Sequence, residues 1–269
     1  MESGTVSDSL FSWLNYVDPM VSKVPILATN PMFVFIFIIV YLLVAFHLGP
    51  LLVASSKPAD LRPYMLISNA LIFGASAMGI PLAMYLTSWA TIPWQCPEPY
   101  IQPALLETQI YLGVAFFLIQ LFTASTTIYM IVRKKETQNP GLDALRTSGI
   151  IFLVYFGARQ HPRGPFLFRP ICEIILATLR RAYYILLTPV QSYGSYRSLK
   201  NLINYSTLAS GIINTGHIGY MFTRDCPGDV NIKLISMTTA AIEATYLTYT
   251  LVIKGKSNDK IDCKDGKDK

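Results

Sequence analysis

Long apolar stretches separated by short polar segments dominate this chain. An α-helix needs roughly 20 apolar residues to cross about 30 Å of hydrocarbon. Six stretches reach that length: Pro31–Ala54, Tyr64–Trp89, Leu105–Val132, Ile171–Val190, Leu202–Phe222 and Ile232–Ile253. A seventh, Leu142–Gln160, has an uninterrupted apolar core only at Gly149–Ala158, and Pro162 ends it because proline cannot continue a helix.

This pattern predicts an all-α membrane protein with seven transmembrane helices. It divides the chain into an N-terminal segment (1–30), a seven-helix domain (31–253) and a tail rich in Lys and Asp (254–269). No basic start followed by an apolar run precedes the first stretch, so we expect the first helix to act as the signal anchor.

Composition supports a membrane protein and excludes several other classes. Charged residues make up 14% of the chain, hydrophobic residues 52%, and the mean hydropathy is +0.41. A soluble domain carries about 25% charged residues. A disordered chain, a coiled coil and a small disulfide-rich secreted domain are also excluded. The net charge of +6 is therefore a signal of membrane topology, and we expect a lipid bilayer and no nucleic acid as partner.

The distribution of Lys and Arg predicts the orientation of the helices. The first, third and fifth loops and the tail together hold fourteen of these residues, whereas the loops on the opposite side hold six. Because cytosolic segments are enriched in Lys and Arg, the C-terminus is expected in the cytosol and the N-terminus in the lumen or outside the cell. The fourth loop, with Arg159, Arg163 and Arg169, disagrees with this orientation.

Two of the four cysteines, Cys96 and Cys226, fall in the second and sixth loops. The predicted topology places both on the oxidising side, where a disulfide between them would join the second and third helices to the sixth and seventh. The alternative is two free thiols in proline-rich loops. We favour the disulfide.

Two adjacent arginines, Arg180 and Arg181, lie in the middle of the fifth helix. At roughly 2.5–3.5 kcal/mol each on insertion scales, the pair costs about 5–7 kcal/mol unless it is compensated. Adjacent helix positions are about 100° apart, so the two can hardly face one partner. Candidate partners are Glu107, Glu173 and Glu243. The arrangement fits either a structural ion-pair network or a polar cavity that binds an anion such as a phosphate or carboxylate, and we favour the cavity.

Of the three histidines, only His217 is expected inside the helix bundle in a polar setting, where packing and a cavity role are equally compatible with the sequence. His47 is expected to pack between helices and His161 to be solvated. The sequence has no phosphate loop, no dinucleotide glycine pattern and no metal-spaced set of Cys and His, so no cofactor or metal is expected.

Several ordered segments together resemble the ELO family of very-long-chain fatty-acid elongases (3-oxoacyl-CoA synthases). The segments are Tyr41-Leu-Leu with Leu48-Gly-Pro50, Lys57-Pro-Ala-Asp-Leu-Arg62, Arg133-Lys-Lys-Glu-Thr-Gln138, Tyr183-Tyr184, Gly216-His217 and Asp225-Cys-Pro227. Cys96 is similar to the lumenal cysteine of the family that pairs with the one in the sixth loop. The resemblance implies seven helices in the endoplasmic-reticulum membrane and the condensation of malonyl-CoA with a long-chain acyl-CoA.

The same register shows where the chain departs from the family. The H-x-x-H-H box falls on Asp143, Arg146 and Thr147. The K-x-x-E-x-x-D-T stretch falls on Gln120, Thr123, Thr126 and Thr127. The N-x-x-x-H-x-x-M-Y motif falls on Glu173, Ala177, Arg180 and Arg181, and the T-x-x-Q-x-x-Q-F motif falls on Asn204, Thr207, Ser210 and Gly211. Condensation needs a nucleophile or base, a role that imidazole fills near pH 7 and that arginine cannot, because it does not deprotonate.

These observations favour an ELO-type protein whose catalytic motifs are largely lost and which binds acyl-CoA or lipid in a regulatory role, alone, as a homodimer or with other elongase-complex proteins. The candidate substrate-binding residues are Glu173, Arg180, Arg181, Tyr183, Tyr184 and His217. An active elongase with relocated catalytic residues, in which His217 is the candidate, is the first alternative. A seven-span receptor or small transporter is the second.

Overall fold

The protein was analysed as a computed structural model that describes residues 12–57, 60–91, 94, 103–134, 140–160, 167–187, 197–224 and 230–248. All regular structure in these ranges is helical. The helices are η1 (Val21–Lys23), α2 (Pro25–Ala28), α3 (Met32–Leu43), η2 (Val44–Leu48), α4 (Gly49–Val53), α5 (Arg62–Leu86), α6 (Pro103–Val132), α7 (Pro140–Gln160), α8 (Phe168–Leu187), α9 (Arg197–Thr223) and α10 (Val230–Thr248). A helix therefore occupies each of the seven predicted ranges, counting α3, η2 and α4 as one.

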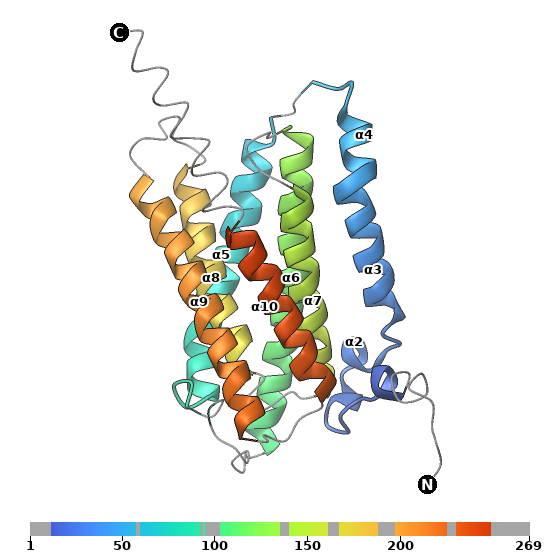
Figure 1. Cartoon of the computed structure of the whole chain (residues 1–269), viewed down its shortest axis with the longest axis vertical. Coiled ribbons are helices and arrows are strands. Elements are labelled where there is room, and N and C mark those ends of the chain that lie inside the picture. Colours follow the sequence, from blue (N-terminus) through green and yellow to red (C-terminus); the bar gives the residue numbers. More distant parts are fainter. Residues whose placement is uncertain are drawn as a thin grey trace.

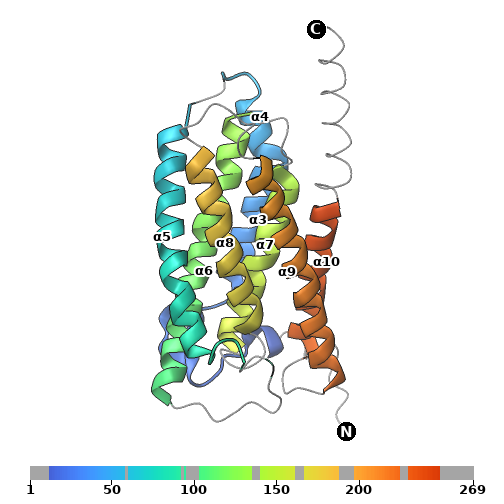
Figure 2. The same cartoon turned by 90° about the vertical axis from the view of Figure 1, so that its left-hand side faces the viewer.

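Six helices form a closed ring. Going round it, α5 contacts α6, α6 contacts α7, α7 contacts α10, α10 contacts α9, α9 contacts α8, and α8 returns to α5. Figure 2 shows α5 and α10 at opposite edges of this ring. The helix formed by α3, η2 and α4 lies outside it, along one side of the bundle in Figure 1, and contacts α6 and α7. The ring thus encloses an interior to which six helices contribute.

The outer helix changes its winding at η2, which is a π-helical turn. Pro50, at the start of α4, has no backbone N–H and its ring would clash with the carbonyl four residues earlier. Such prolines are accommodated in membrane helices by local π adjustments. Beside it, Gly49 allows a close approach to α6, because a Cβ there would lie 3.0 Å from Ile131 Cγ2. The turn leaves His47 exposed, so the expectation that it packs between helices is wrong.

The bundle carries apolar side chains outside and many polar ones inside. Leu52, Leu71 and Met78 are among the exposed side chains, at 78%, 70% and 73%. In contrast, the buried residues include the charged groups Arg146, Arg169, Arg181, Glu173 and Glu243. This pattern is the reverse of a soluble bundle and is expected of helices that face lipid.

Four helices in the described ranges are long and apolar enough to cross a membrane: Met32–Val53, Arg62–Leu86, Ala104–Val132 and Pro140–Gln160. The weakest of the seven predicted stretches, Leu142–Gln160, lies in α7 and is thus among these four helices. The helices α8, α9 and α10 comprise 20, 27 and 19 residues, the shortest of which measures about 28 Å. They are less apolar because several of their polar side chains point into the ring.

The N-terminal segment is held against the end of α7 by Arg159, which is 2% exposed. Its guanidinium donates to the carbonyl oxygens of Tyr16 (3.1 Å), Leu27 (2.8 Å) and Thr29, and to the hydroxyl of Tyr155 (3.0 Å). An arginine with this many protein acceptors is not a loop charge.

This burial revises the count of charges used to predict the topology. Arg159 and Arg169, two of the three arginines that disagreed with the predicted orientation, lie inside the bundle. Arg146, counted on the cytosolic side, is buried as well. Leaving out all three removes one residue from the cytosolic side and two from the other, so the bias toward a cytosolic C-terminus increases.

Candidate functional site

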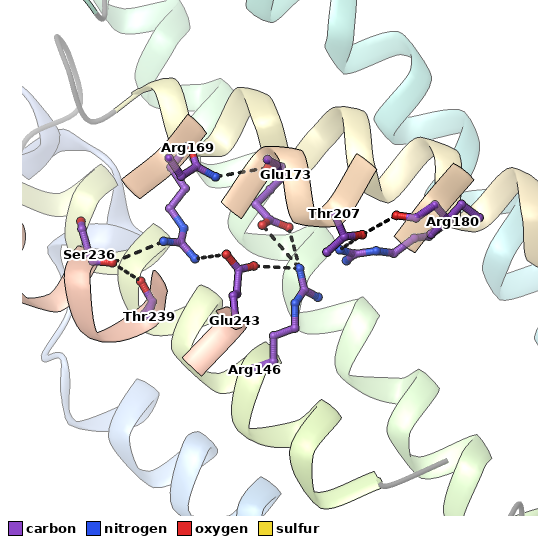
Figure 3. Close-up of polar contacts among 11 residues, drawn as sticks. Arg146, Arg169, Glu173, Arg180, Thr207, Ser236, Thr239 and Glu243 are labelled. Atoms are coloured by element: carbon purple, nitrogen blue, oxygen red, sulfur yellow. Dashed lines mark hydrogen bonds and ion pairs between the residues drawn. The ribbon is translucent and has the colours of Figure 1, made fainter. Parts of the chain in front are cut away.

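Four charged side chains meet inside the ring, as Figure 3 shows. Arg146 of α7 lies 3.2 Å from Glu173 Oε2 and 3.0 Å from Glu243 Oε1, measured from its Nη2. Arg169 Nη2 lies 3.0 Å from Glu243 Oε2. Glu243 of α10 therefore joins an arginine of α7 to an arginine of α8. We call Arg146, Arg169, Glu173 and Glu243, together with the carbonyl group of Ser236 that accepts from Arg169, the charge network.

Local structure explains how α8 contributes two members of the network. Arg169 and Glu173 are four residues apart, so they lie on the same face of the helix, one turn apart. The helix begins at Phe168, and Pro170 is tolerated there because the first turn has no intrahelical use for its N–H. The predicted helix began at Ile171, with Arg169 in the preceding loop. Both predictions are wrong, because the helix already includes Arg169.

A glycine brings α10 close enough to α7 for the network to form. A Cβ at Gly149 would lie 3.1 Å from Thr239 Cγ2 of α10. Thr239 in turn donates to the Ser236 carbonyl oxygen (2.9 Å), which also accepts from Arg169 Nη1 at 3.4 Å. Small residues at helix crossings are typical of membrane bundles because they let backbones approach.

The two adjacent arginines of α8 diverge, as their positions predict. Arg180 donates to Thr207 Oγ1 of α9 at 3.3 Å, and Arg181 donates to Asn69 Oδ1 of α5 at 2.7 Å. Figure 3 shows Arg180 directed toward Thr207, beside the charge network. Arg181 is buried and Arg180 half-buried. Each arginine thus links α8 to a different neighbour in the ring.

A second polar chain joins the outer helix to the ring. Tyr41 of α3 and Thr127 of α6 are 2.6 Å apart at their hydroxyl oxygens, and Thr127 Oγ1 donates to Asp143 Oδ2 of α7 at 2.7 Å. Thr127 is the residue on which the last position of the K-x-x-E-x-x-D-T stretch falls.

The three positions assigned to the histidine box lie within one turn of α7 and carry buried or partly buried polar groups. Asp143 bonds Thr127, Arg146 is in the charge network, and Thr147 is 3% exposed. Arg146 contacts Glu173, the residue at the first position of the N-x-x-x-H-x-x-M-Y motif. Residues placed on separate motifs by the register are therefore neighbours in space.

An apolar pocket of about 950 Å³, part of it open to the surroundings, adjoins the charge network. All six ring helices contribute to its wall. Apolar side chains such as Phe116, Leu153 and Ile218 form most of the lining, and Arg169 and Ser236 belong to both the pocket and the network.

His217 lies in the wall of this pocket and is 3% exposed. Its ring stacks on Phe168 with centroids 4.5 Å apart and meets Trp94 edge-on at 4.7 Å. His217 is buried, as expected, and it combines aromatic packing with a place in the pocket wall, so both roles that the sequence left open stay predictions.

The remaining candidate residues are distributed more widely. Tyr183 and Tyr184 are half-buried near the end of α8, with ring centroids 5.5 Å apart. Glu107 is exposed on α6, so it is not a partner of the buried arginines. Cys96 and Cys226 lie outside the described residues, as does His161. The disulfide between Cys96 and Cys226 stays a prediction.

Sequence reasoning missed three polar residues of the site: Arg169, Gln109 and Asn214. Gln109 and Asn214 line the pocket and are 2% and 1% exposed. The four-residue spacing between Arg169 and Glu173 was a signal that could have identified Arg169. The sequence offers no signal for the amides, because single Asn and Gln residues also occur at ordinary helix contacts.

The charge network is electrically balanced, with two arginines and two glutamates. Each glutamate of the charge network lies within 3.2 Å of at least one arginine nitrogen. Within the described ranges, no group of three or more His, Cys, Asp or Glu could hold a metal ion. The arrangement can orient a polar group at the edge of an apolar pocket.

The ring with its polar interior and apolar exterior defines a multi-pass helical membrane protein. The family model ELO, described as the GNS1/SUR4 family, matches residues 26–253, and the chain belongs to this family. The chain is 22% identical to very long chain fatty acid elongase 1 of Homo sapiens over 173 residues, which are 64% of this chain and 61% of that protein. The mouse protein of the same name matches to the same extent.

A further relative covers more of both chains. Very long chain fatty acid elongase 7 of Rattus norvegicus is 22% identical over 218 residues, which are 80% of this chain and 77% of the rat protein. The matched part spans less than two thirds of the human and mouse relatives. Family membership follows from the match of the family model.

Proposed function

We propose that this protein is an acyl-CoA- or lipid-binding member of the ELO family, resident in the endoplasmic-reticulum membrane, which does not catalyse the condensation of malonyl-CoA with acyl-CoA. Its role is regulatory, alone, as a homodimer or as a partner of active elongases. The ring of six helices holds the acyl chain, and in the register of the family resemblance Arg146 of the charge network stands at a position of the histidine box.

The observation that carries this proposal is the pairing of Arg146 with Glu173 and Glu243 at 3.2 and 3.0 Å. A guanidinium stays protonated and can neither accept a proton nor attack a thioester. The carboxylates next to it are committed to ion pairs. The residues at this position therefore supply charge balance where condensation needs a nucleophile and a base.

The apolar pocket supports retention of the ligand. Its lining suits a hydrocarbon chain, and its contact with Arg169 gives it one charged edge. A bound acyl chain would bury apolar surface, which contributes about 25 cal/mol per Å². Loss of the catalytic groups leaves this contribution in place.

The orientation of the chain is part of the proposal. Seven long helices, of which four have the length and apolarity of spans, support seven crossings with a lumenal N-terminus and a cytosolic C-terminus. Residence in the endoplasmic reticulum is carried over from the family.

A condensation assay on the purified full chain in detergent tests the proposal. It supplies labelled malonyl-CoA and a panel of long-chain acyl-CoAs, with the rat elongase 7 as positive control, and measures both product and retained acyl-CoA. We expect retained acyl-CoA without product. Product at a rate comparable with the control would contradict the proposal.

A second candidate function is a working elongase with its chemistry rebuilt around His217, because that imidazole lies in the wall of the pocket. A His217→Ala variant in the same assay tests it: product from the original chain that disappears in the variant would establish this function. Absence of both product and bound acyl-CoA would instead favour the receptor or transporter class.

A further inference from the structure

Three residues that line the pocket carry buried polar atoms that an unsubstituted hydrocarbon chain would leave unsatisfied. Among the described residues, Gln109 Oε1, Asn214 Oδ1 and Arg169 Nε are buried and have no hydrogen-bond partner. All three residues line the pocket, and each is at least nine-tenths buried. Burying such an atom without a partner costs about as much as a lost hydrogen bond, so a ligand that satisfies them is favoured over one that does not.

The other atoms of these side chains fix which groups are spare. Gln109 Nε2 donates to the Leu86 carbonyl oxygen at 2.8 Å, which can only accept, so the amide oxygen of Gln109 is the group left over. Asn214 Nδ2 contacts Ser210 Oγ at 3.2 Å. Arg169 uses Nη1 and Nη2 on Ser236 and Glu243, which leaves its Nε–H. The atoms without any partner on these three residues are therefore two amide oxygens, which accept, and one Nε–H, which donates.

Charge decides what kind of group fits them. Arg169 is already balanced by Glu243, and the rest of the lining is almost entirely apolar. A carboxylate or phosphate would bring an extra negative charge into this setting, and it has no donor for the two amide oxygens. An ammonium group could satisfy the acceptors but would add a positive charge beside Arg169. A hydroxyl is neutral, donates one hydrogen bond and accepts others.

We propose that the pocket selects a hydrocarbon chain that carries a hydroxyl group. The hydroxyl donates to the amide oxygen of Gln109 or Asn214 and can accept from Arg169 Nε. Where the hydrocarbon chain is part of an acyl-CoA, this inference rests on the proposed function and narrows its ligand class to hydroxyacyl-CoA. A free long-chain alcohol offers the same chemistry.

Equilibrium binding to the purified full chain in detergent tests this with two matched pairs of labelled probes. The first pair is 16-hydroxyhexadecanoyl-CoA and hexadecanoyl-CoA, which differ only by the terminal hydroxyl. The second pair is hexadecan-1-ol and hexadecyl methyl ether, which differ in the hydrogen-bond donor. We expect the donor-bearing member of at least one pair to bind about ten-fold more tightly, equivalent to about 1.4 kcal/mol.

Variants locate the preference. Gln109→Met and Asn214→Leu remove one acceptor each, and we expect the substitution of the acceptor that the hydroxyl uses to reduce the ten-fold preference to about two-fold or less. Thr108→Val, at an exposed position next to Gln109 and outside the pocket, serves as the control and should keep the full preference. The readout is a ratio of two affinities on the same protein, so a uniform loss of folded protein does not change it. The measurement on the original chain decides the matter even where a variant does not fold.

The outcomes separate this inference from the proposed function. Equal affinities within both pairs would overturn the inference, because the amide oxygens would then be satisfied by water whatever ligand is bound. A preference within the acyl-CoA pair identifies the hydroxyacyl-CoA as the source of the hydroxyl. If no acyl-CoA binds but the alcohol is preferred over the ether, the hydroxyl site stands and the proposed acyl-CoA function fails. A preference that survives both amide substitutions would contradict the assignment to Gln109 and Asn214.

Discussion

Arg146 and Glu173 lie 27 residues apart in sequence and meet within the ring, where both are almost fully buried. Removing one member of a buried ion pair leaves the partner charge uncompensated, which costs about 3–5 kcal/mol. We expect Arg146→Leu to lower the free energy of unfolding by that amount, because it leaves Glu173 without this pairing and Glu243 with only Arg169. Thermal unfolding of the purified protein in detergent measures the change.

The matched control is Arg62→Leu. Arg62 lies 3.6 Å from Asp60, and both side chains are more than half exposed. Exposed pairs contribute about 0–1 kcal/mol, so this variant should unfold near the temperature of the original chain. Equal shifts for the two variants would contradict the structural role assigned to Arg146.

The charged residues also show how far sequence reasoning extends. The divergence of Arg180 and Arg181 could be predicted, because it follows from the angle between adjacent helix positions. The partner of Glu173 could not. The sequence named Glu173 as a candidate partner of Arg180 and Arg181, whereas the ion pair that the structure shows is with Arg146, on another helix. Contacts within a helix follow from spacing alone, but contacts between helices depend on how the ring closes.

At the crossing of α7 and α10, Gly149 allows the close approach on which the Arg146–Glu243 pair depends. We expect Gly149→Val to destabilise the protein by about 1–3 kcal/mol, because the new side chain would collide with Thr239. Thermal unfolding checks this, with Gly74→Val as control, since a Cβ at Gly74 meets nothing within 4 Å. A Gly149→Val protein as stable as the control would show that the two helices are not held closely together.

The N-terminal segment depends on Arg159, which donates to several of its carbonyl oxygens. Hydrogen bonds from a charged donor contribute about 1.5–3 kcal/mol each. We expect Arg159→Met to accelerate amide hydrogen exchange in 13–30 by on the order of ten-fold or more, with little change in α9. Arg224→Met, at an exposed position after α9, should leave exchange in 13–30 unchanged. Unaltered exchange in Arg159→Met would contradict this role.

The helices themselves were predictable to within a few residues, because the apolar stretches are long. The π-helical turn at η2 was not, although Gly49 and Pro50 are visible in the sequence. Proline predicts a local irregularity but does not say whether the helix kinks, breaks or rewinds. The helices α8, α9 and α10 were predicted from the length of their apolar stretches, and the ring explains the polar residues among them, because several of these side chains face its interior.

The whole chain has a predicted orientation that glycosylation can test. An Asn-Gly-Thr acceptor on a short linker is placed before Met1 in one variant and after Lys269 in another. We expect modification of the first alone, because glycosylation occurs on the lumenal side. The unextended chain, which contains Asn204-Tyr-Ser206 within α9, is the control for modification elsewhere. Modification only at the C-terminal acceptor would reverse the topology.

Photo-crosslinking with an acyl-CoA that carries a diazirine at the end of its chain measures most directly whether the ring encloses an acyl site. The label should reach pocket residues such as Leu112, Ile218 and Met221, and excess hexadecanoyl-CoA should compete it away. Label confined to outward-facing residues such as Ile36 and Leu52, or unaffected by the competitor, would mean that the chain contacts only the lipid-facing surface. That result would contradict an acyl-binding interior.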